Sequence, residues 1–265
     1  MELNFINQIR GIAFILMFIY HIFIFLKAMN FYDYLNNPLL DIIGQFSRNT
    51  FIILVGVSLY LSYINSKNIT EYKKKQILRA IKIYCIAIFV TIITYIYIND
   101  YYVVFGVLHF ISISIFLLYN FVNNIPILLF IVGLCIYLSN FNYINMNNSF
   151  LDYINSIIGF NFYKNTIDHF SLIKWIPMII LGIFIGHIIH YNLPSVDKSI
   201  KKTSTQSKKP HNSKKIIKKP RKKLKKKPNN TNIDILSWIG KNTLVLYIIH
   251  IPIIIFSIKY YFNLN

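Results

Sequence analysis

Three histidines, His21, His109 and His250, each lie inside a separate long apolar stretch of the sequence. A neutral imidazole can take a proton from an attacking amine or hydroxyl, or it can carry an acyl group as a nucleophile. An ionisable side chain inside a bilayer is costly, so each of these positions indicates a function. The chemistry depends on whether the three stretches bring these imidazoles to one place.

Counting along helices predicts that the three histidines lie at one depth. At about 1.5 Å per residue, His21 lies roughly 20 Å above the inner end of its stretch, and His109 and His250 lie roughly 18 and 21 Å above theirs. A hydrocarbon core is about 30 Å thick, so all three fall about two-thirds of the way toward the outer face. Arg10 shares a helical face with His21, and Tyr247 shares one with His250. We therefore expect a common pocket between the first, fourth and last membrane helices.

The composition indicates that a membrane positions these residues. Of the 265 residues, 55% are hydrophobic and 14% are charged, whereas a soluble domain has about 25% charged residues. Each membrane helix needs about 20 mostly apolar residues. The sequence predicts an all-α, polytopic transmembrane helix bundle of about seven spans, at approximately 8–27, 45–66, 77–98, 102–122, 125–144, 174–192 and 235–258.

The distribution of lysine and arginine predicts a cytoplasmic N-terminus in a multi-pass protein of the plasma membrane. All but five of the 28 Lys and Arg residues then lie on the inner side; the five are Lys27, Arg48, Lys164, Lys174 and Lys259.

Fifteen of the inner basic residues lie in one segment, 195–231, whose like charges and three prolines favour disorder. We expect this segment to lie on anionic lipid headgroups. It lacks the interleaved aromatic residues of a nucleic-acid-binding surface, which argues against a nucleic-acid partner. It divides one membrane domain into residues 1–194, with six spans, and residues 232–265, with the last span.

Several other polar residues have possible roles that the sequence indicates less strongly. Arg48, at the start of the second span, can bind an anion, and the adjacent Asp168 and His169 form a pair that can do acid–base work. His187 and His190, at the inner end of the sixth span, are predicted to be interfacial. The two cysteines lie singly in apolar runs, and no residue spacing indicates a metal site.

Five short groups of residues follow one another along the predicted spans. They are Ile9–Ala13 with Met17 and His21; Phe46–Arg48 with Phe51 and Gly56–Ser58; Phe105–Ile111; Trp175–Pro177 with Gly182 and Gly186; and Gly240–Leu244 with Tyr247, His250 and Pro252. In this order they resemble the catalytic domain of the heparan-alpha-glucosaminide N-acetyltransferase family of membrane-bound acetyltransferases. The resemblance covers about residues 4–258. The chain departs from the family's common pattern at Asn7, where an acidic residue is usual, and at Ile251, where a polar residue is usual.

The resemblance implies transfer of an acetyl group from cytosolic acetyl-CoA to an acceptor on the far side of the membrane, often an amino sugar. It also implies that the phosphates of coenzyme A bind on the inner side. The expected cofactor-binding residues are Arg10, Arg79 and Lys241.

Within such a reaction we expect His21 to be the principal catalytic residue, because a buried neutral imidazole can act as a base or as a covalent acetyl carrier. His109 and His250 would orient the acceptor or stabilise the oxyanion. The outer loop, 145–173, is expected to carry a short helix over the site. The expected acceptor-binding residues are Arg48, Tyr247 and Asp168.

Two alternative functions are open from the sequence. One is O-acylation of the acyltransferase-3 type, whose members also begin with an Arg-Gly pair and a first-span histidine but usually have around ten spans. The other is a small transporter in which the histidines relay protons, although the chain shows no internal inverted repeat. A homo-oligomer is compatible with the sequence, which does not identify the acceptor.

Overall fold

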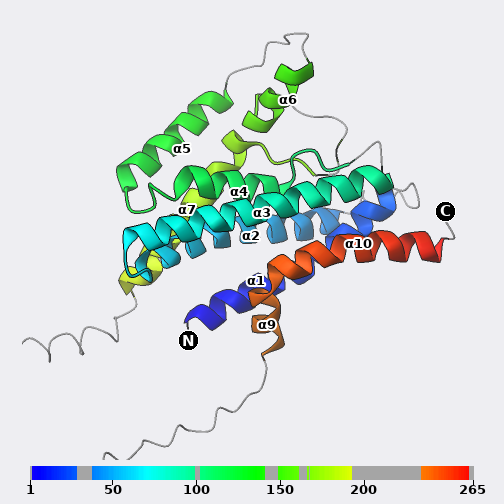
Figure 1. The fold of residues 1–265 in the computed structure, drawn as a ribbon, viewed down its shortest axis with the longest axis horizontal. Coiled ribbons are helices and arrows are strands. Elements are labelled where there is room, and N and C mark those ends of the chain that lie inside the picture. The colour runs from blue at the N-terminus through cyan, green and yellow to red at the C-terminus, as the bar shows by residue number, and fades with distance from the viewer. Residues whose placement is uncertain are drawn as a thin grey trace, which may run out of the picture.

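The computed structural model describes residues 2–28, 38–98, 102–140, 149–160, 166, 168–192 and 234–262. Within these residues the chain is helical, and a polytopic helical bundle is confirmed (Figure 1). The helices long and apolar enough to cross a membrane are α1 (Glu2–Ala28), α2 (Pro38–Ile64), α3 (Ile69–Ile98), α7 (Leu172–Asn192) and α10 (Thr243–Tyr261). The shorter helices are α4 (Val107–Leu118), α5 (Ile125–Ser139), α6 (Ser149–Ile158) and α9 (Ile235–Lys241). The Lys-rich segment lies outside the described residues, so its expected role stays a prediction.

The predicted fourth span, 102–122, is wrong as a single continuous helix. Its helical part, α4, has only 12 residues and rises about 18 Å, less than the thickness of a hydrocarbon core. The residues before α4 are extended, and Phe105 forms an isolated parallel bridge with His169. The backbone N–H of Phe170 donates to the carbonyl of Phe105 at 3.0 Å. Non-helical backbone is tolerated at membrane depth when protein surrounds it, and Phe105 is buried.

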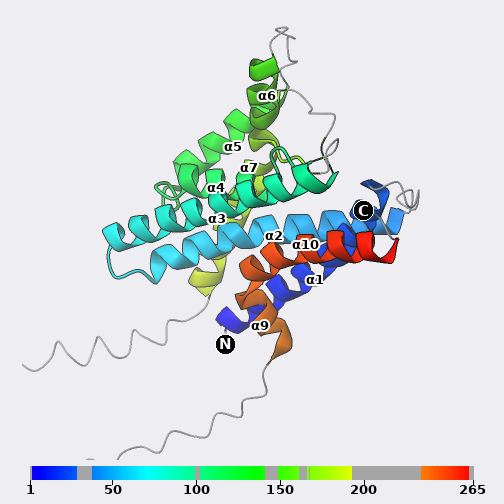
Figure 2. The same ribbon diagram turned by 45° about the vertical axis from the view of Figure 1, so that its right-hand side comes forward.

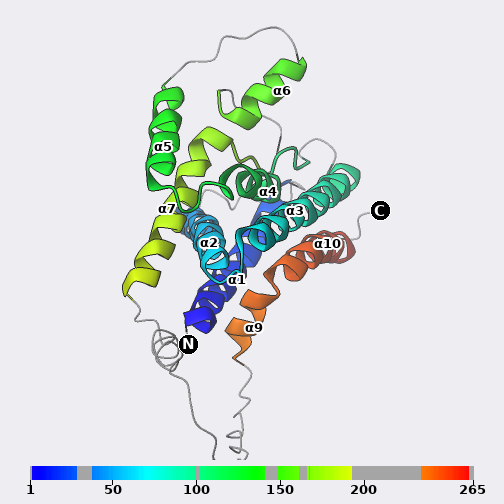
Figure 3. The same ribbon diagram turned by 60° about the vertical axis from the view of Figure 1, so that its left-hand side comes forward.

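The fifth and last predicted spans also need correction. α5 ends at Ser139, earlier than predicted, and it packs beside α7 (Figure 3). The last span is broken at Asn242 into α9 and α10, which meet at a steep angle (Figure 1). α9 instead packs on the start of α1. Gly240 allows this close approach because it has no side chain, whereas a Cβ there would strike the backbone of Asn7. This contact places the end of α9 beside the first turns of α1.

Helices α2 and α7 approach each other through glycine. A Cβ on Gly56 would strike the carbonyl oxygen of Ile179, and a Cβ on Gly182 would strike that of Ile53. Small residues let membrane helices pack backbone against backbone, which is a main source of their association. Gly56 and Gly182 therefore allow the close approach of the two helices. α7 crosses behind α2 in the turned view of Figure 2.

The start of α1, the turn between α2 and α3, and the end of α7 lie toward one end of the bundle, and the C-terminus lies at the other (Figure 1). We call the first the inner end, following the predicted orientation. The structure holds no membrane, so a cytoplasmic inner end stays a prediction from the charge distribution. α6 supplies the short helix expected in the outer loop.

Candidate active site

Helices α1 and α10 lie against each other and bring His21 and His250 together. Nε2 of His250 lies 3.2 Å from Nδ1 of His21, and the ring centroids are 5.1 Å apart. His250 is buried, as is Tyr247 one turn earlier on the same face of α10. The predicted meeting of the first and last spans is therefore observed.

Hydrogen bonding fixes which nitrogens carry protons when both rings are neutral. Nδ1 of His250 lies 2.7 Å from the carbonyl oxygen of Tyr247. Because a carbonyl only accepts, this Nδ1 carries the proton. Nε2 of His250 then has the lone pair and accepts from the Nδ1–H of His21. His21 is left with its own lone pair on Nε2, which makes that nitrogen the candidate base.

His109 lies in the first turn of α4 and faces the same space from the other side. Its buried ring packs 5.7 Å from the rings of Tyr84 and Phe105, measured between centroids. His21 and His109 both line a cavity of about 20 Å³, which we call the central cavity. A space of that volume holds about one water molecule. His21 and His109 thus share one small cavity, and His250 joins this site through its contact with His21, while the catalytic roles of all three stay a proposal.

Asp168 caps α4 from a distant part of the chain. Its Oδ2 accepts the backbone N–H of Val107 at 3.1 Å, and the N-cap residue of α4, Gly106, has no side chain to do so. A Cβ on Gly106 would meet Oδ2 of Asp168 at 2.8 Å, so glycine allows this approach. The N-terminus of α4 lines the central cavity, where the helix dipole and free N–H groups favour negative charge. This is a suitable place for an oxyanion.

The buried carboxyl of Asp168 is expected to make the stability of the protein depend on pH. Burial raises the pKa of Asp168 from 3.8 to about 6, although the Val107 N–H and the Arg48 charge each lower it in part. A carboxyl whose pKa is higher in the folded state disfavours folding once it ionises. The free energy of unfolding should therefore fall as the pH rises from about 4 to about 6.

Asp168→Asn should abolish this dependence, because the amide oxygen still accepts from Val107 but does not titrate. Thermal unfolding in detergent at several pH values measures the effect. The stability of the variant relative to wild type should increase from pH 4 to pH 7 by at most about 3 kcal/mol. The exposed Asp41→Asn is the control for loss of one carboxylate. A stability difference that stays constant with pH would contradict this assignment.

An outer cavity of about 80 Å³ adjoins the central cavity, and His21 and Asp168 line both. Arg48 lines the outer cavity, with its guanidinium carbon 4.9 Å from the ring centroid of Trp175 and 5.9 Å from that of Phe170. Nε of Arg48 is buried and has no hydrogen-bond partner among the described residues. The guanidinium of Arg48 is held against aromatic rings, and its Nε–H can donate to a hydroxyl or an anionic group of an acceptor.

An inner cavity of about 190 Å³ also adjoins the central cavity, and Leu108 and Tyr247 line both. Arg10, Arg79 and Lys241 all line the inner cavity, from α1, α3 and α9. The three residues predicted to bind phosphate groups are thus brought together by three different helices. The central cavity adjoins both of the others, Phe51 lines the inner and the outer cavity, and His21 lines the central and the outer cavity.

Comparison with known proteins identifies the family of this chain. A family model described as heparan-alpha-glucosaminide N-acetyltransferase, catalytic, matches residues 3–217. The chain belongs to this family. No curated protein and no solved structure gives a significant match. The chain is therefore a member of a family of membrane acetyltransferases, and the matched region contains α1 to α7. α9 and α10 lie beyond the match, so Tyr247 and His250 join the site through the contacts described above.

Asn7 stands where an acidic residue is usual in the heparan-alpha-glucosaminide N-acetyltransferase family, yet Arg10 remains paired. Nη1 of Arg10 donates to Oδ1 of Asn7 at 3.3 Å and to the carbonyl of Gly240 at 3.4 Å. Its Nη2 lies 2.6 Å from Oγ of Ser58. A neutral amide therefore replaces a carboxylate here, which leaves the positive charge of Arg10 without neutralisation by that side chain. Ile251, the second departure, lines the central cavity and makes that wall apolar.

Sequence reasoning did not assign Tyr20 to this acetyltransferase site. Tyr20 lines the outer cavity with Arg48, and a Cβ on Gly44 would strike its ring. The sequence feature that could have identified Tyr20 is its position directly before His21. Adjacent residues on a helix usually face different directions, so this feature is weak.

Asp168 and His169, predicted as an acid–base pair, each contact a different backbone group. Nε2 of His169 lies 3.0 Å from the carbonyl oxygen of Ser156 in α6, whereas Asp168 caps α4. Burial lowers the pKa of His169, although the bond to Ser156 partly opposes this. Its position indicates a structural link between α6 and the site.

Proposed function

We propose that this chain transfers an acetyl group from acetyl-CoA, bound at the cytoplasmic side, to an amino sugar or another cell-envelope glycan on the outer side of the plasma membrane. The observation that carries the proposal is the His21–His250 pair, in which His21 lines the central cavity that adjoins both the cationic inner cavity and the outer cavity. Acetyl-CoA would supply the activated acetyl group as a thioester.

The inner cavity suits the anionic end of such a donor. Arg10, Arg79 and Lys241 surround it with three positive charges, and phosphate groups favour such sites. Arg10 and His21 are eleven residues apart on α1, which is about 16 Å along the helix. That rise is comparable with the length of the pantetheine arm that separates the diphosphate of coenzyme A from its sulfur. The cations and the base are therefore spaced for the two ends of that arm.

The histidine pair can move the proton that acetyl transfer releases. Nε2 of His21 takes the proton of the acceptor amine while the amine nitrogen forms its bond to the acetyl carbon. His250 holds the Nδ1–H of His21 and stabilises the imidazolium. The N-terminus of α4 faces the developing oxyanion. When the carbon–sulfur bond breaks, His21 returns the proton to the sulfur, and a thiol and an acetamide leave.

The purified protein in detergent, incubated with labelled acetyl-CoA and glucosamine, tests this proposal. The expected product is labelled N-acetylglucosamine. Label on the protein in the absence of glucosamine would instead indicate a two-step route through an acetylated histidine. Label released from the sugar by hydroxylamine would indicate O-acylation, and a transporter would leave the sugar unlabelled.

Arg79→Ala is expected to raise the KM for acetyl-CoA about 10- to 100-fold, because a hydrogen bond to a charged group contributes about 1.5–3 kcal/mol. The protein yield should not change, because Arg79 lines the cavity and is only partly buried. Lys82→Ala is the matched control, since Lys82 is an exposed cation one turn further along α3. Equal KM values for the two variants would contradict a role for the inner cavity in donor binding.

A further inference from the structure

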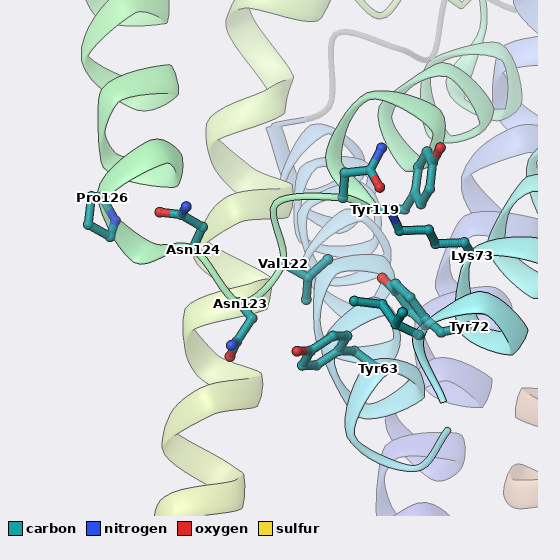
Figure 4. Close-up of a pocket in the computed structure, with 10 residues that line it drawn as sticks. Tyr63, Tyr72, Lys73, Tyr119, Val122, Asn123, Asn124 and Pro126 are labelled. Carbon is teal, nitrogen blue, oxygen red and sulfur yellow. The ribbon is translucent and has the colours of Figure 1, made fainter. Parts of the chain in front are cut away.

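A fourth cavity, of about 290 Å³, lies at the inner end of the bundle, beside the α2–α3 turn and the α4–α5 loop. We call it the end pocket (Figure 4). Its lining contains three tyrosines, three asparagines and one lysine, with three apolar residues. The volume is near the lower end of the range for small-molecule sites, about 300–1,000 Å³. None of its residues lines the inner, central or outer cavity.

Tyr72 lines the end pocket and has a buried hydroxyl. Tyr72 is only 1% exposed, and its hydroxyl has no hydrogen-bond partner among the described residues. Its ring packs edge-on against Tyr63, with centroids 5.3 Å apart. In Figure 4 the Tyr63 hydroxyl points toward the loop that carries Val122 and Asn123. A buried polar group left unpaired costs about 1–3 kcal/mol, so a bound polar ligand is its most economical explanation.

The kinds of side chain around the end pocket identify the ligand chemistry. An asparagine amide offers a donor beside an acceptor, the pattern that pairs with the edge of a purine. Tyrosine faces stack on bases. Lys73, which reaches toward Tyr119 in Figure 4, supplies the charge that a phosphate requires. A lipid headgroup would engage the lysine but would leave the amides and the aromatic faces without partners.

We propose that the end pocket binds a nucleoside phosphate. One source is the nucleotide end of the acetyl donor, and this source rests on the proposed function. Tyr72 and Arg79 are seven residues apart on one face of α3, so the end pocket and the inner cavity are separated by about 10 Å along that helix. The other source is a free nucleotide that binds from the cytoplasm.

Direct binding tests the proposal without any acetyl transfer. Adenosine 3′,5′-bisphosphate is titrated calorimetrically into the purified protein in detergent. Wild type should bind, and Lys73→Ala and Tyr72→Phe should each weaken the affinity about tenfold, because one removes the charge and the other only the hydroxyl. Lys74→Ala, an exposed neighbour outside the pocket, should bind like wild type. Absence of binding to wild type, or equal affinities in all four proteins, would overturn the proposal.

Kinetics then separate the two sources of the nucleoside phosphate. If the pocket holds the donor's nucleotide, Lys73→Ala should raise the KM for acetyl-CoA and leave the KM for S-acetylpantetheine, which lacks the nucleotide, unchanged. If it holds a free nucleotide, both KM values should stay unchanged while bisphosphate affinity is still lost. A rise of both KM values together would indicate a general structural defect and would overturn the assignment. A protein that binds the bisphosphate but transfers no acetyl group would refute the proposed function alone.

Discussion

Replacement of His21 by alanine is expected to reduce acetyl transfer by about 10²–10⁴-fold, the usual contribution of a general base. His21 is the histidine of the pair whose Nε2 lone pair stays outside the bond between the two rings, because the Nε2 lone pair of His250 accepts the Nδ1–H of His21. His21→Asn is the sharper variant. Its amide N–H can still donate to His250, while no nitrogen base remains in place of Nε2. Transfer from labelled acetyl-CoA to glucosamine, normalised to purified protein, measures both.

The control for the His21 variants is His190→Ala, which removes an exposed histidine at the inner end of α7 and should keep full activity. The two members of the pair act as one unit, so the double variant of His21 and His250 should be no worse than the His21 variant alone. Retention of wild-type activity by His21→Asn would contradict the role of His21 as the general base. Additive losses in the double variant would show that His250 acts separately.

Gly56→Val is expected to prevent accumulation of folded protein. The α2–α7 contact leaves no room for a side chain, because even a Cβ at Gly56 would strike the carbonyl oxygen of Ile179. Overpacking usually costs about 1–3 kcal/mol when side chains can shift, and here the obstacle is helix backbone, which yields less. Size-exclusion chromatography and thermal unfolding in detergent report the loss.

Gly133→Val is the matched control for Gly56→Val. No atom lies within 4 Å of a Cβ built at Gly133, among the residues that the structure describes, so a side chain fits there. This glycine also lies within an apolar helix, α5, so the two substitutions differ mainly in packing. If both variants accumulated and melted like wild type, the close α2–α7 crossing would be incorrect.

The meeting of His21 with His250 could be predicted from sequence because it depends only on helical periodicity and alternating topology. Two spans of regular helix place residues at matching depths, and both histidines lie on faces that carry other small or polar residues. The charge distribution placed Arg10, Arg79 and Lys241 on one side of the membrane, but that they line one cavity is seen only in the structure. The family model independently confirmed the resemblance over α1 to α7.

The cap on α4 could not be predicted, because it joins residues 61 positions apart through irregular backbone. Hydropathy treats 102–122 as one apolar run and does not reveal that its first residues are extended. Asp168 and Gly106 are individually ordinary, and only their close approach shows why each is needed. The break at Asn242 was missed for a similar reason, since α9 packs on α1 through glycine contacts that periodicity does not report.

The central claim is that the histidine pair catalyses transfer of an acetyl group from a donor on one face of the membrane to an acceptor on the other. The direct measurement uses protein reconstituted in vesicles, selected so that the inner end faces outward, with glucosamine trapped inside and labelled acetyl-CoA added only outside. The account predicts that labelled N-acetylglucosamine appears inside the vesicles for wild type and not for His21→Asn. Product formed only when donor and acceptor are on the same side, or formed equally by His21→Asn, would contradict it.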